Sequence, residues 1–485
     1  TQADVVLVRN CAGSKQCQFI EFFISWYHTL AILEDCRSVR EYRAHLLVLA
    51  LYVLLALVLT WPLVLHLTTH IPGSAGWAFD ESTFVWNMWW FKFSLLDLGQ
   101  SPLHTEYIFY PLGIDLVLYT FNFFNALLGL PFQMIFPLPS ASNLVILFSF
   151  VLSGYGGYLL VLYLLINGRR EDEKRADILP CQLAAFVTGA VYAFSASRMI
   201  YAALGHYDMV TAQWFPFYTL FLLKALRKRG YRNAVLAGIF AVFALLAEMI
   251  FGVFLLFLTL ILLLFELREG KSPQPASYIP YRRGHVAHRL FRVIPVLAVL
   301  AVTVAILWSP VMIPVLRAFA QGDFALVGWG EGLKLSADLV GWFTPTPLHP
   351  ILGADDWPAH LRAVIEGNAP FRDVNTVFLG YGVLLLAIIG VIGMWKQARA
   401  WACAAIVFAL QDLWSAFAGW LVIVGSRKFS IGDRVEIDGK RGDVLEIQLL
   451  RTTILEVNNW LVVDEPTGRV VLVPNNFVFK SQVFN

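Results

Sequence analysis

The chain has 485 residues, of which 58% are hydrophobic, 15% are aromatic and only 14% carry a charged side chain. A soluble fold of this length has no core large enough for so much apolar surface, so the composition predicts an integral membrane protein whose first partner is the lipid bilayer. The formal net charge of +2 is too small to favour a nucleic-acid-binding protein. The five cysteines follow neither a disulfide framework nor zinc-ligand spacing, and we expect free thiols.

Residues 1–43 form a poorly defined N-terminal segment. The apolar run at 19–33 is interrupted by Glu21 and His28, which favours a helix on the membrane surface over a crossing. The chain begins at Thr1 rather than at methionine, and this segment holds neither a secretory signal nor a clear spanning helix. We expect a surface segment, with a fragmentary sequence as the alternative.

The first predicted span covers residues 46–66, whose length is close to the ~20 apolar residues that a helix needs to cross a bilayer. The segment that follows, 68–115, holds five acidic residues against one basic residue, Lys92. Basic residues gather instead before the first span and in the stretches 167–175, 224–232 and 281–292. The positive-inside rule therefore places these basic stretches in the cytoplasm and the acidic segment outside.

Asp80 and Glu81 lie just beyond the first span, in the acidic segment. A carboxylate beside the outer membrane face can act as a general base on an acceptor hydroxyl, or bind a divalent metal that holds a diphosphate. The alternative is a pair of solvated loop acids, which the residues alone favour. The tryptophans that follow are expected to form a membrane-interface belt rather than a sugar-binding platform; they are Trp86, Trp89 and Trp90.

Eight crossings are predicted before residue 400, and about eight to ten in the whole chain. The stretch 116–136 is left out of the count because a crossing there would carry the basic stretch 167–175 outside, and its polar residues favour an interfacial segment. The outer loops are then 67–116 and 317–375. The predicted spans are 46–66, 143–166, 183–200, 210–226, 234–252, 253–266, 291–316 and 376–395.

Three more ionisable residues of this region are candidates for a supporting role. His206 and Asp208 fall on a second outer turn, on the same side as Asp80, and their alternative role is to anchor that turn. Glu248 interrupts an apolar run, where an ionisable group is costly and usually faces a cavity or a partner. Packing against a polar residue of another helix is the alternative reading for Glu248.

The sequence changes character after residue 400. Val435 and Ile437 alternate with charged residues, and glycines punctuate the runs that follow, which predicts four or five short strands in a small antiparallel barrel. Gly432, Gly439 and Gly442 fall where turns or close backbone approach are expected. The predicted fold class is therefore mainly α, a polytopic helical membrane protein followed by a small antiparallel β-barrel domain.

Residues 44–400 resemble the polytopic GT-C superfamily, especially YfhO-like bacterial membrane proteins. The resemblance rests on the order of the first span, the acidic outer loop, "WNMWWF", "YPLG", "NLVILFSFVLSGYGGYLL", "GAVYAFSASRMIYAALGHYD" and "SADLVGWFTPTPLHPILG". It implies transfer of a sugar from a polyprenyl-phosphate carrier to an acceptor at the outer face. Asp80 would then be the base or metal ligand, with Glu81 beside it and a divalent metal as the one possible cofactor.

The last 77 residues contain "ALQDLWSAFAGWLVIVGSRKFSIGDRVEIDGKRGDVLEIQLLRTTI" and "VVLVPNNFVFKSQVFN", which closely resemble the small-conductance mechanosensitive channel (MscS) family. The resemblance implies a pore or interfacial helix at 401–429 and a cytoplasmic β-domain at 430–485, Sm/SH3-like, in a heptamer of the bacterial inner membrane that needs no cofactor. The sequence stops before the α/β cage of that family. The family positions present are Gly419, Phe429, Gly432, Asp433, Gly442, Thr452, Thr453, Pro474 and Asn475.

The two resemblances leave three hypotheses open. In the first, the chain is an MscS-type channel subunit with extra helices around the pore. In the second, it is a GT-C-type glycosyltransferase, and the β-domain serves oligomerisation or docking. In the third, the two parts come from a fusion or a chimera, because they meet abruptly near residue 409. Eight crossings also leave residue 400 inside, so a full span at 401–425 would carry the β-domain outside, contrary to the family.

Overall fold

The computed structural model divides the chain into two compact units, Thr1–Leu55 and Ala56–Asn485. The first contributes the beginning of helix α3 to the described structure, and the remaining elements belong to the second. The structure describes residues 39–73, 80–116, 121–167, 178–228, 230–269, 285–321, 339–345, 352, 378–393, 395, 420, 423–424, 429–437, 440–449, 451–457, 466–475 and 483–484.

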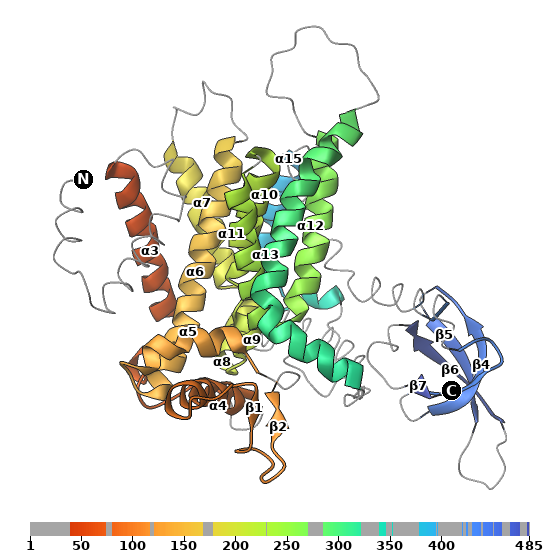
Figure 1. Ribbon diagram of the computed structural model, residues 1–485. Coiled ribbons are helices and arrows are strands. Elements are labelled where there is room, and N and C mark those ends of the chain that lie inside the picture. Colours follow the sequence, from red (N-terminus) through yellow and green to blue (C-terminus); the bar gives the residue numbers. More distant parts are fainter. Residues whose placement is uncertain are drawn as a thin grey trace. The chain divides into compact units, whose positions relative to one another are not determined.

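Long apolar helices dominate the membrane region. Figure 1 shows α6, α7, α10, α11, α12 and α13 side by side as a bundle. The described helices of this region are α3 (Val39–Leu59), α6 (Leu138–Asn167), α7 (Ile178–Ala193), α8 (Ala196–Ala203), α10 (Trp214–Lys228), α11 (Tyr231–Ala247), α12 (Ile250–Glu269), α13 (His285–Gln321) and α15 (Tyr381–Gly393).

Four of the described helices are long and apolar enough to cross a membrane, or five if the bent pair α7 and α8 forms one span. The four are α3, α6, α12 and α13, and α11 and α15 are apolar but shorter. The prediction of a multi-span helical protein is confirmed in this form. The expected count of eight to ten crossings depends on the shorter helices as well and stays a prediction.

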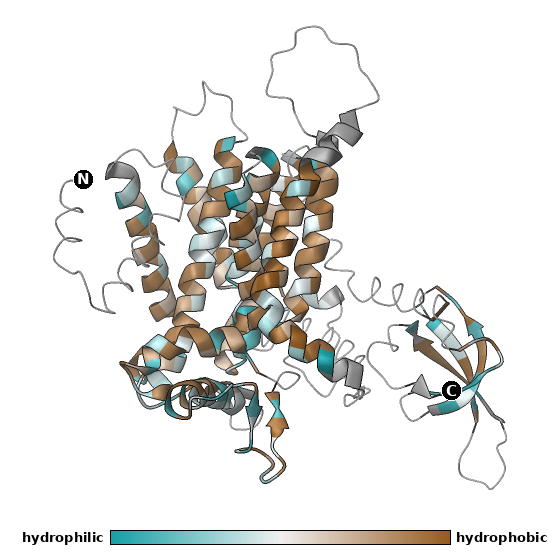
Figure 2. Cartoon of the chain, viewed as in Figure 1, coloured by the Kyte–Doolittle hydropathy of each residue, from teal (hydrophilic) through white to brown (hydrophobic). Residues whose placement is uncertain are grey.

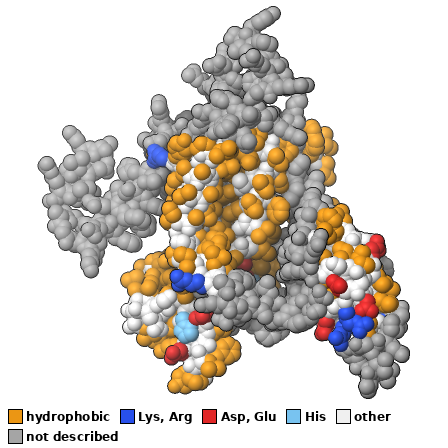
Figure 3. Space-filling view, turned by 45° about the vertical axis from the view of Figure 1, so that its right-hand side comes forward, with side chains coloured by type: hydrophobic (Ala, Val, Ile, Leu, Met, Phe, Trp, Pro, Cys, Tyr) orange, Lys and Arg blue, Asp and Glu red, His pale blue; other side chains and the backbone are white. Residues whose placement is uncertain are grey.

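Helix α6 packs closely against α7 through small residues. A Cβ placed on Gly157 would lie 3.0 Å from the Cα of Gly189, so the two backbones approach as far as glycine allows. The helices consist largely of hydrophobic residues (Figure 2), and the face of the bundle seen in Figure 3 is covered mainly by hydrophobic side chains. Water would not tolerate this much exposed apolar surface, whereas the hydrocarbon chains of a bilayer would solvate it.

Short elements gather at one end of the bundle. Figure 1 shows α4 (Asp80–Lys92), α5 (Phe123–Gln133), α8 and α9 (Tyr207–Val210) at the same end. Helix α5 has 11 residues, too few for a crossing, which agrees with the exclusion of 116–136 from the predicted spans. The predicted outer loop 67–116 contains α4, the π-helical turn η2 (Phe93–Asp97) and the strands β1 (His104–Thr105) and β2 (Ile114–Asp115). The 3-10 helices η1 (Leu63–Leu65) and η5 (Leu339–Trp342) complete the described helical elements.

The C-terminal region is a five-stranded antiparallel sheet, in the order β6-β5-β4-β3-β7. Its strands are β3 (Arg434–Ile437), β4 (Lys440–Ile447), β5 (Arg451–Val457), β6 (Pro466–Pro474) and β7 (Val483–Phe484). Val435, Val444 and Ile454 lie on three adjacent strands, β3, β4 and β5, and point to the same face of the sheet. There they pack with Ile423 and Phe429. The predicted fold class, a mainly helical membrane region followed by a small antiparallel β-domain, is confirmed.

Candidate functional site

The predicted catalytic acids lie at the start of α4. Asp80 is the first residue of this helix, and its side chain lies outside the described part of the structure. Glu81 is half-buried, and its Oε2 atom is buried without a hydrogen-bond partner among the described residues. A buried carboxylate oxygen of this kind retains its capacity to accept a proton or a hydrogen bond from a ligand.

Gly205, in the turn between α8 and α9, makes room for Glu81. Its φ of +75° lies in the left-handed region, and a Cβ there would approach the Cβ of Glu81 too closely and lie 2.6 Å from the carbonyl oxygen of Pro72. The tight turn therefore brings residues 205–208 next to the start of α4. The glycine in the motif "LGHYD" could have indicated this turn, but it was not singled out from the sequence.

The predicted supporting residues come together at this end of the bundle. His206 precedes α9, and its ring lies edge-on to Tyr201 with the ring centroids 5.7 Å apart. Glu248 lies in the break between α11 and α12, near enough to Asp208 for the two carboxylates to interact. Asp208 and Glu248, 40 positions apart in the sequence, thus act on each other electrostatically.

Tyr207 links these acids to the interior of the bundle. Burial raises the pKa of its hydroxyl, a hydrogen bond with Ser142 lowers it, and the charge of Glu81 raises it further. The backbone carbonyl of Tyr207 accepts a hydrogen bond of 3.2 Å from Asn125 Nδ2, and Asn125 Nδ2 also donates to Thr211 Oγ1 at 2.7 Å. We call the group Glu81, His206, Asp208 and Glu248, backed by this buried network, the polar end of the bundle.

Arg198 is a buried cation that the sequence reasoning missed. It lies on α8 with 6% of its surface exposed, and its guanidinium donates hydrogen bonds to the carbonyl oxygens of Ala193 and Val210 and to Ser149 Oγ. The guanidinium also lies over the ring of Phe150, 5.3 Å from its centroid. The feature that could have revealed it is an arginine inside the apolar stretch 183–203, where a charge needs internal partners.

The described residues hold no group of three or more histidine, cysteine, aspartate or glutamate side chains arranged to bind a metal ion. The metal predicted for Asp80 is not tested by this finding, because the side chain of Asp80 is outside the described part. His104 and Asp115 pair at 2.6 Å across β1 and β2, and both side chains are exposed. This pair therefore joins the two strands of the small hairpin, and we do not count it with the acids at the polar end of the bundle.

In the β-domain, the two family positions Gly432 and Asp433 shape the turn before β3. Gly432 has a φ of +93°, and its N–H donates to the carbonyl oxygen of Val444 at 2.8 Å. Asp433 Oδ2 accepts a hydrogen bond from the backbone N–H of Ser430 at 2.6 Å. The turn therefore needs glycine for its conformation and aspartate for its closure.

A buried amide lies where β4 ends, β5 begins and β6 ends. Asn475 is fully buried and follows Pro474, the last residue of β6. Its Oδ1 accepts from Thr452 Oγ1 at 2.7 Å, and its Nδ2 donates to the carbonyl oxygen of Gln448 at 2.7 Å. The neighbouring Thr453 lies opposite Glu446 on one side and Leu472 on the other. The remaining predicted positions are Phe429, which is in the sheet core, Gly442, which lies in β4 against Leu455, and Gly419, which lies outside the described residues.

The C-terminal part of the chain matches a known protein family. Residues 412–485 match the family model described as "Mechanosensitive ion channel, beta-domain". The matched segment contains the five strands, the glycine turn at Gly432 and the buried amide of Asn475. It covers the end of the chain, and the resemblance of residues 44–400 to the GT-C superfamily has no such support. The C-terminal part of this membrane protein is therefore similar to the β-domain of mechanosensitive ion channels.

Proposed function

We propose that the chain is a subunit of a tension-gated ion channel of the MscS type, in which the β-domain follows a pore segment at 401–429. The observation that carries this proposal is the family match of residues 412–485. The long apolar helices support it further, because they would anchor the subunit in the bilayer. By the same resemblance, the protein is a homo-oligomer, a heptamer as in the family, in the bacterial inner membrane with its β-domain in the cytoplasm.

Tension would favour the state that occupies more area in the membrane plane. A subunit with many lipid-facing helices couples to the bilayer over a large surface, so an outward movement of these helices would widen a central pore. Arg427 and Lys428 follow the apolar residues 420–424, a pattern suited to the anionic inner surface of the membrane. The β-domain would hold the subunits in register while the pore segments move.

Survival of osmotic downshock tests this function in cells. Cells that lack their own tension-gated channels should survive a sudden dilution when they produce the full chain, because an open pore releases solutes before the envelope breaks. A chain without residues 412–485 should give no protection at an equal amount in the membrane. Equal survival with and without these residues would contradict the proposed role of the β-domain.

A second candidate function is transfer of a lipid-linked sugar at the outer face. The observation that favours it is the buried Oε2 atom of Glu81, which has no partner among the described residues, at the polar end of the bundle. Asp80 or Glu81 would take the proton of an acceptor hydroxyl as its oxygen bonds to the anomeric carbon, and the polyprenyl phosphate would leave with the electrons of the broken bond. His206, Asp208 and Glu248 would support this base, and a divalent metal at Asp80 would stabilise the leaving phosphate.

The two candidates predict different effects of the same substitutions. Asp80→Asn and Glu81→Gln keep the size of each side chain but remove its basicity, so each should abolish sugar transfer from a polyprenyl-phosphate donor to an acceptor. Neither should alter the protection from downshock if the protein is a channel. Sugar transfer that is absent in the unsubstituted protein would exclude the second candidate and leave the first untouched.

A further inference from the structure

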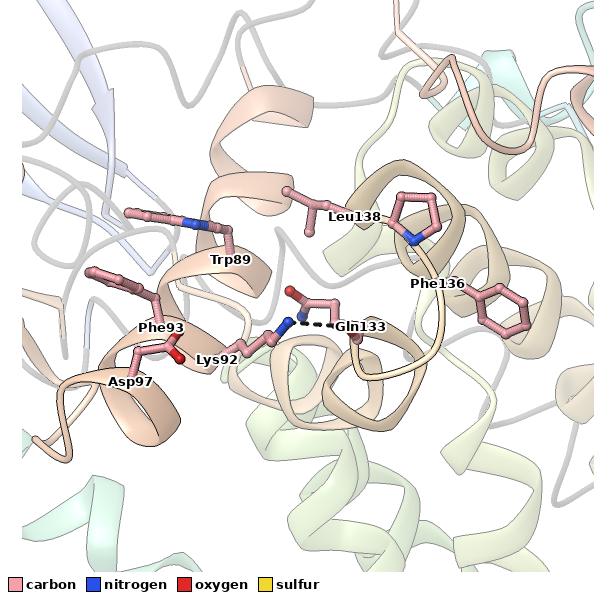
Figure 4. Close-up of a pocket in the computed structure, with 8 residues that line it drawn as sticks. Trp89, Lys92, Phe93, Asp97, Gln133, Phe136 and Leu138 are labelled. Carbon is pink, nitrogen blue, oxygen red and sulfur yellow. Dashed lines mark hydrogen bonds between the residues drawn. The ribbon is translucent and has the colours of Figure 1, made fainter.

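A pocket lies beside the end of α4, apart from the polar end of the bundle. Its volume is about 180 Å³, and its walls come from α4, the π-helical turn η2 and the junction between α5 and α6 (Figure 4). A π-helical turn widens the helix and often occurs at functional sites. The side chains important for its chemistry are Trp89, Lys92, Phe93, Asp97, Gln133 and Phe136.

Lys92 supplies a fixed positive charge in this pocket. Its Nζ donates one hydrogen bond, of 3.1 Å, to the backbone carbonyl of Gln133, drawn as a dashed line in Figure 4. Gln133 is itself held in place, because its buried Nε2 donates to the carbonyl oxygen of Met88 at 2.9 Å. Within the described part of the chain, no carboxylate forms an ion pair with Lys92. Two N–H groups of the ammonium therefore remain for an anionic acceptor.

Aromatic rings form an apolar wall next to this charge. The rings of Trp89 and Phe93 are stacked, with centroids 5.0 Å apart and planes 13° from parallel. Tyr107 packs edge-on against Phe93 at 5.7 Å. This packing fixes the orientation of Trp89 and Phe93, so the pocket keeps its shape without a ligand.

The start of helix α6 relates the pocket to the predicted membrane span. Helix α6, a candidate span of 30 residues, begins at Leu138, which also lines the pocket. At a rise of 1.5 Å per residue, α6 is about 45 Å long, whereas the hydrocarbon core of a bilayer is about 30 Å thick. If the hydrocarbon core begins at the predicted span 143–166, the first residues of α6, beside the pocket, lie at the level of the lipid headgroups.

Exposed apolar side chains flank the pocket on both sides. On the α5–α6 junction, Met134 and Ile135 are 70% and 76% exposed. On the turn η2 and just after it, Leu95, Leu96 and Leu98 are also exposed. Such side chains next to a charged pocket fit a ligand that has both an anionic head and apolar chains.

We propose that this pocket binds the phosphodiester headgroup of an anionic membrane phospholipid, with Lys92 bonded to the phosphate and the acyl chains lying along the exposed apolar residues. A phosphodiester carries one negative charge. The doubly charged phosphate of a monoester would be repelled more strongly by Asp97, which lies on the same pocket wall. The proposed ligand goes beyond both candidate functions and depends on neither.

Lipid binding to the purified full chain in detergent tests this proposal. The probes are dioleoyl phosphatidylglycerol, dioleoyl phosphatidylcholine and the soluble phosphate monoester glycerol 3-phosphate, and native mass spectrometry counts the bound molecules. The substitution Lys92→Ala removes the phosphate contact, whereas Lys92→Arg keeps a cation. The matched control, Arg232→Ala, removes one exposed cation from the start of α11, away from the pocket.

We expect phosphatidylglycerol to bind the unsubstituted protein and the Lys92→Arg and Arg232→Ala variants with similar affinity. The Lys92→Ala variant should bind it about tenfold more weakly, the loss typical of one charge-assisted hydrogen bond. An unchanged melting temperature of this variant would show that the loss is local. Equal binding by Lys92→Ala, no preference for phosphatidylglycerol over phosphatidylcholine, or full competition by glycerol 3-phosphate would each overturn the proposal.

Discussion

Arg434 and Asp443 form a two-pronged ion pair across strands β3 and β4. The distances are 2.7 Å from Nε to Oδ1 and 3.2 Å from the second guanidinium nitrogen to Oδ2. The hydrogen bonds from Arg434 lower the pKa of the Asp443 carboxyl, burial opposes them, and the charge of Arg434 lowers the pKa further, so that the net shift is downward. Both side chains are about a third exposed, so the solvent screens the pair.

This pair predicts a loss of β-domain stability in acid. Because the pKa of Asp443 is lower in the folded state, its contribution is complete above the usual carboxyl pKa of about 3.9 and disappears as the pH falls through the lowered value. Asp443→Asn should cost a few tenths of a kcal/mol at neutral pH, the usual range for exposed pairs, and nothing in strong acid. Hydrogen-exchange protection of β3 and β4, corrected for intrinsic rates, would measure this. A cost that stays the same as the pH is lowered into strong acid would contradict the assignment.

Gly442 is a position where a side chain has no space. A Cβ there would collide with the backbone of Leu455 on β5, whose carbonyl carbon would lie 2.9 Å away. Gly442→Ala should therefore destabilise the β-domain by about 1–3 kcal/mol, the usual cost of overpacking. Protection of β4 and β5 in hydrogen exchange is the measurement, and Val470→Ala, at a site 55% exposed on β6, is the control. Equal protection in both variants would show that the sheet adjusts to the extra methyl group.

At the residue scale, the sequence predicted turns better than contacts. Gly432 and Gly442 were expected to serve a turn or a close approach, and the structure gives both features. The partners of Asn475 could not be predicted, because Gln448 and Thr452 reach it only after β5 and β6 have paired. Asp208 and Glu248 were likewise chosen separately, and their mutual effect depends on the packing of two distant helix ends.

Arg198 connects four helices of the bundle. From α8 it bonds to the end of α7 and the end of α9, and it reaches Ser149 on α6. Ser149 in turn donates to Gln213 Oε1 at 2.7 Å. These contacts satisfy buried carbonyl groups where two helices, α7 and α9, end, so the arginine has a structural role that apolar packing could not fill.

Arg198→Ala should lower the melting temperature of the full chain in detergent. The change leaves the carbonyl oxygens of Ala193 and Val210 without this donor, and we expect a cost on the order of 3 kcal/mol. Arg198→Lys should recover part of the stability, because the ammonium keeps the charge but reaches fewer acceptors. Thr188→Ala is the control, since Thr188 is exposed and its hydroxyl bonds within its own helix. A melting temperature that is the same for Arg198→Ala and the control would contradict the structural role.

At the element scale, hydrophobic runs predicted which segments are helical but not where each helix ends. The predicted span 234–252 covers most of α11, but this helix ends before Glu248, and α12 begins two residues after Glu248. The apolar run continues through this break, so hydropathy alone could not locate it. Within the predicted outer loop 67–116, residues 80–97 form α4 and the turn η2, whose aromatic residues pack together, and the acidic composition of the loop gave no sign of these elements.

At the scale of the whole molecule, the sequence predicted the division into apolar helices and a β-domain, because hydropathy and alternation change abruptly near residue 400. The predicted count of eight to ten crossings stays a prediction, since several described helices are shorter than a membrane requires. The pocket at Lys92 was also beyond prediction. Lys92 was recognised as the one basic residue of an acidic segment, but its partner Gln133 is 41 positions away and joins it through a backbone atom.

Current through the reconstituted protein tests the central claim most directly. The full chain is placed in liposomes, and a patch of membrane is held at constant voltage while suction raises the tension. The account predicts single-channel openings whose frequency rises with suction and which disappear when residues 412–485 are removed. A correctly assembled oligomer that conducts no current up to the tension at which the membrane ruptures would contradict the proposed channel.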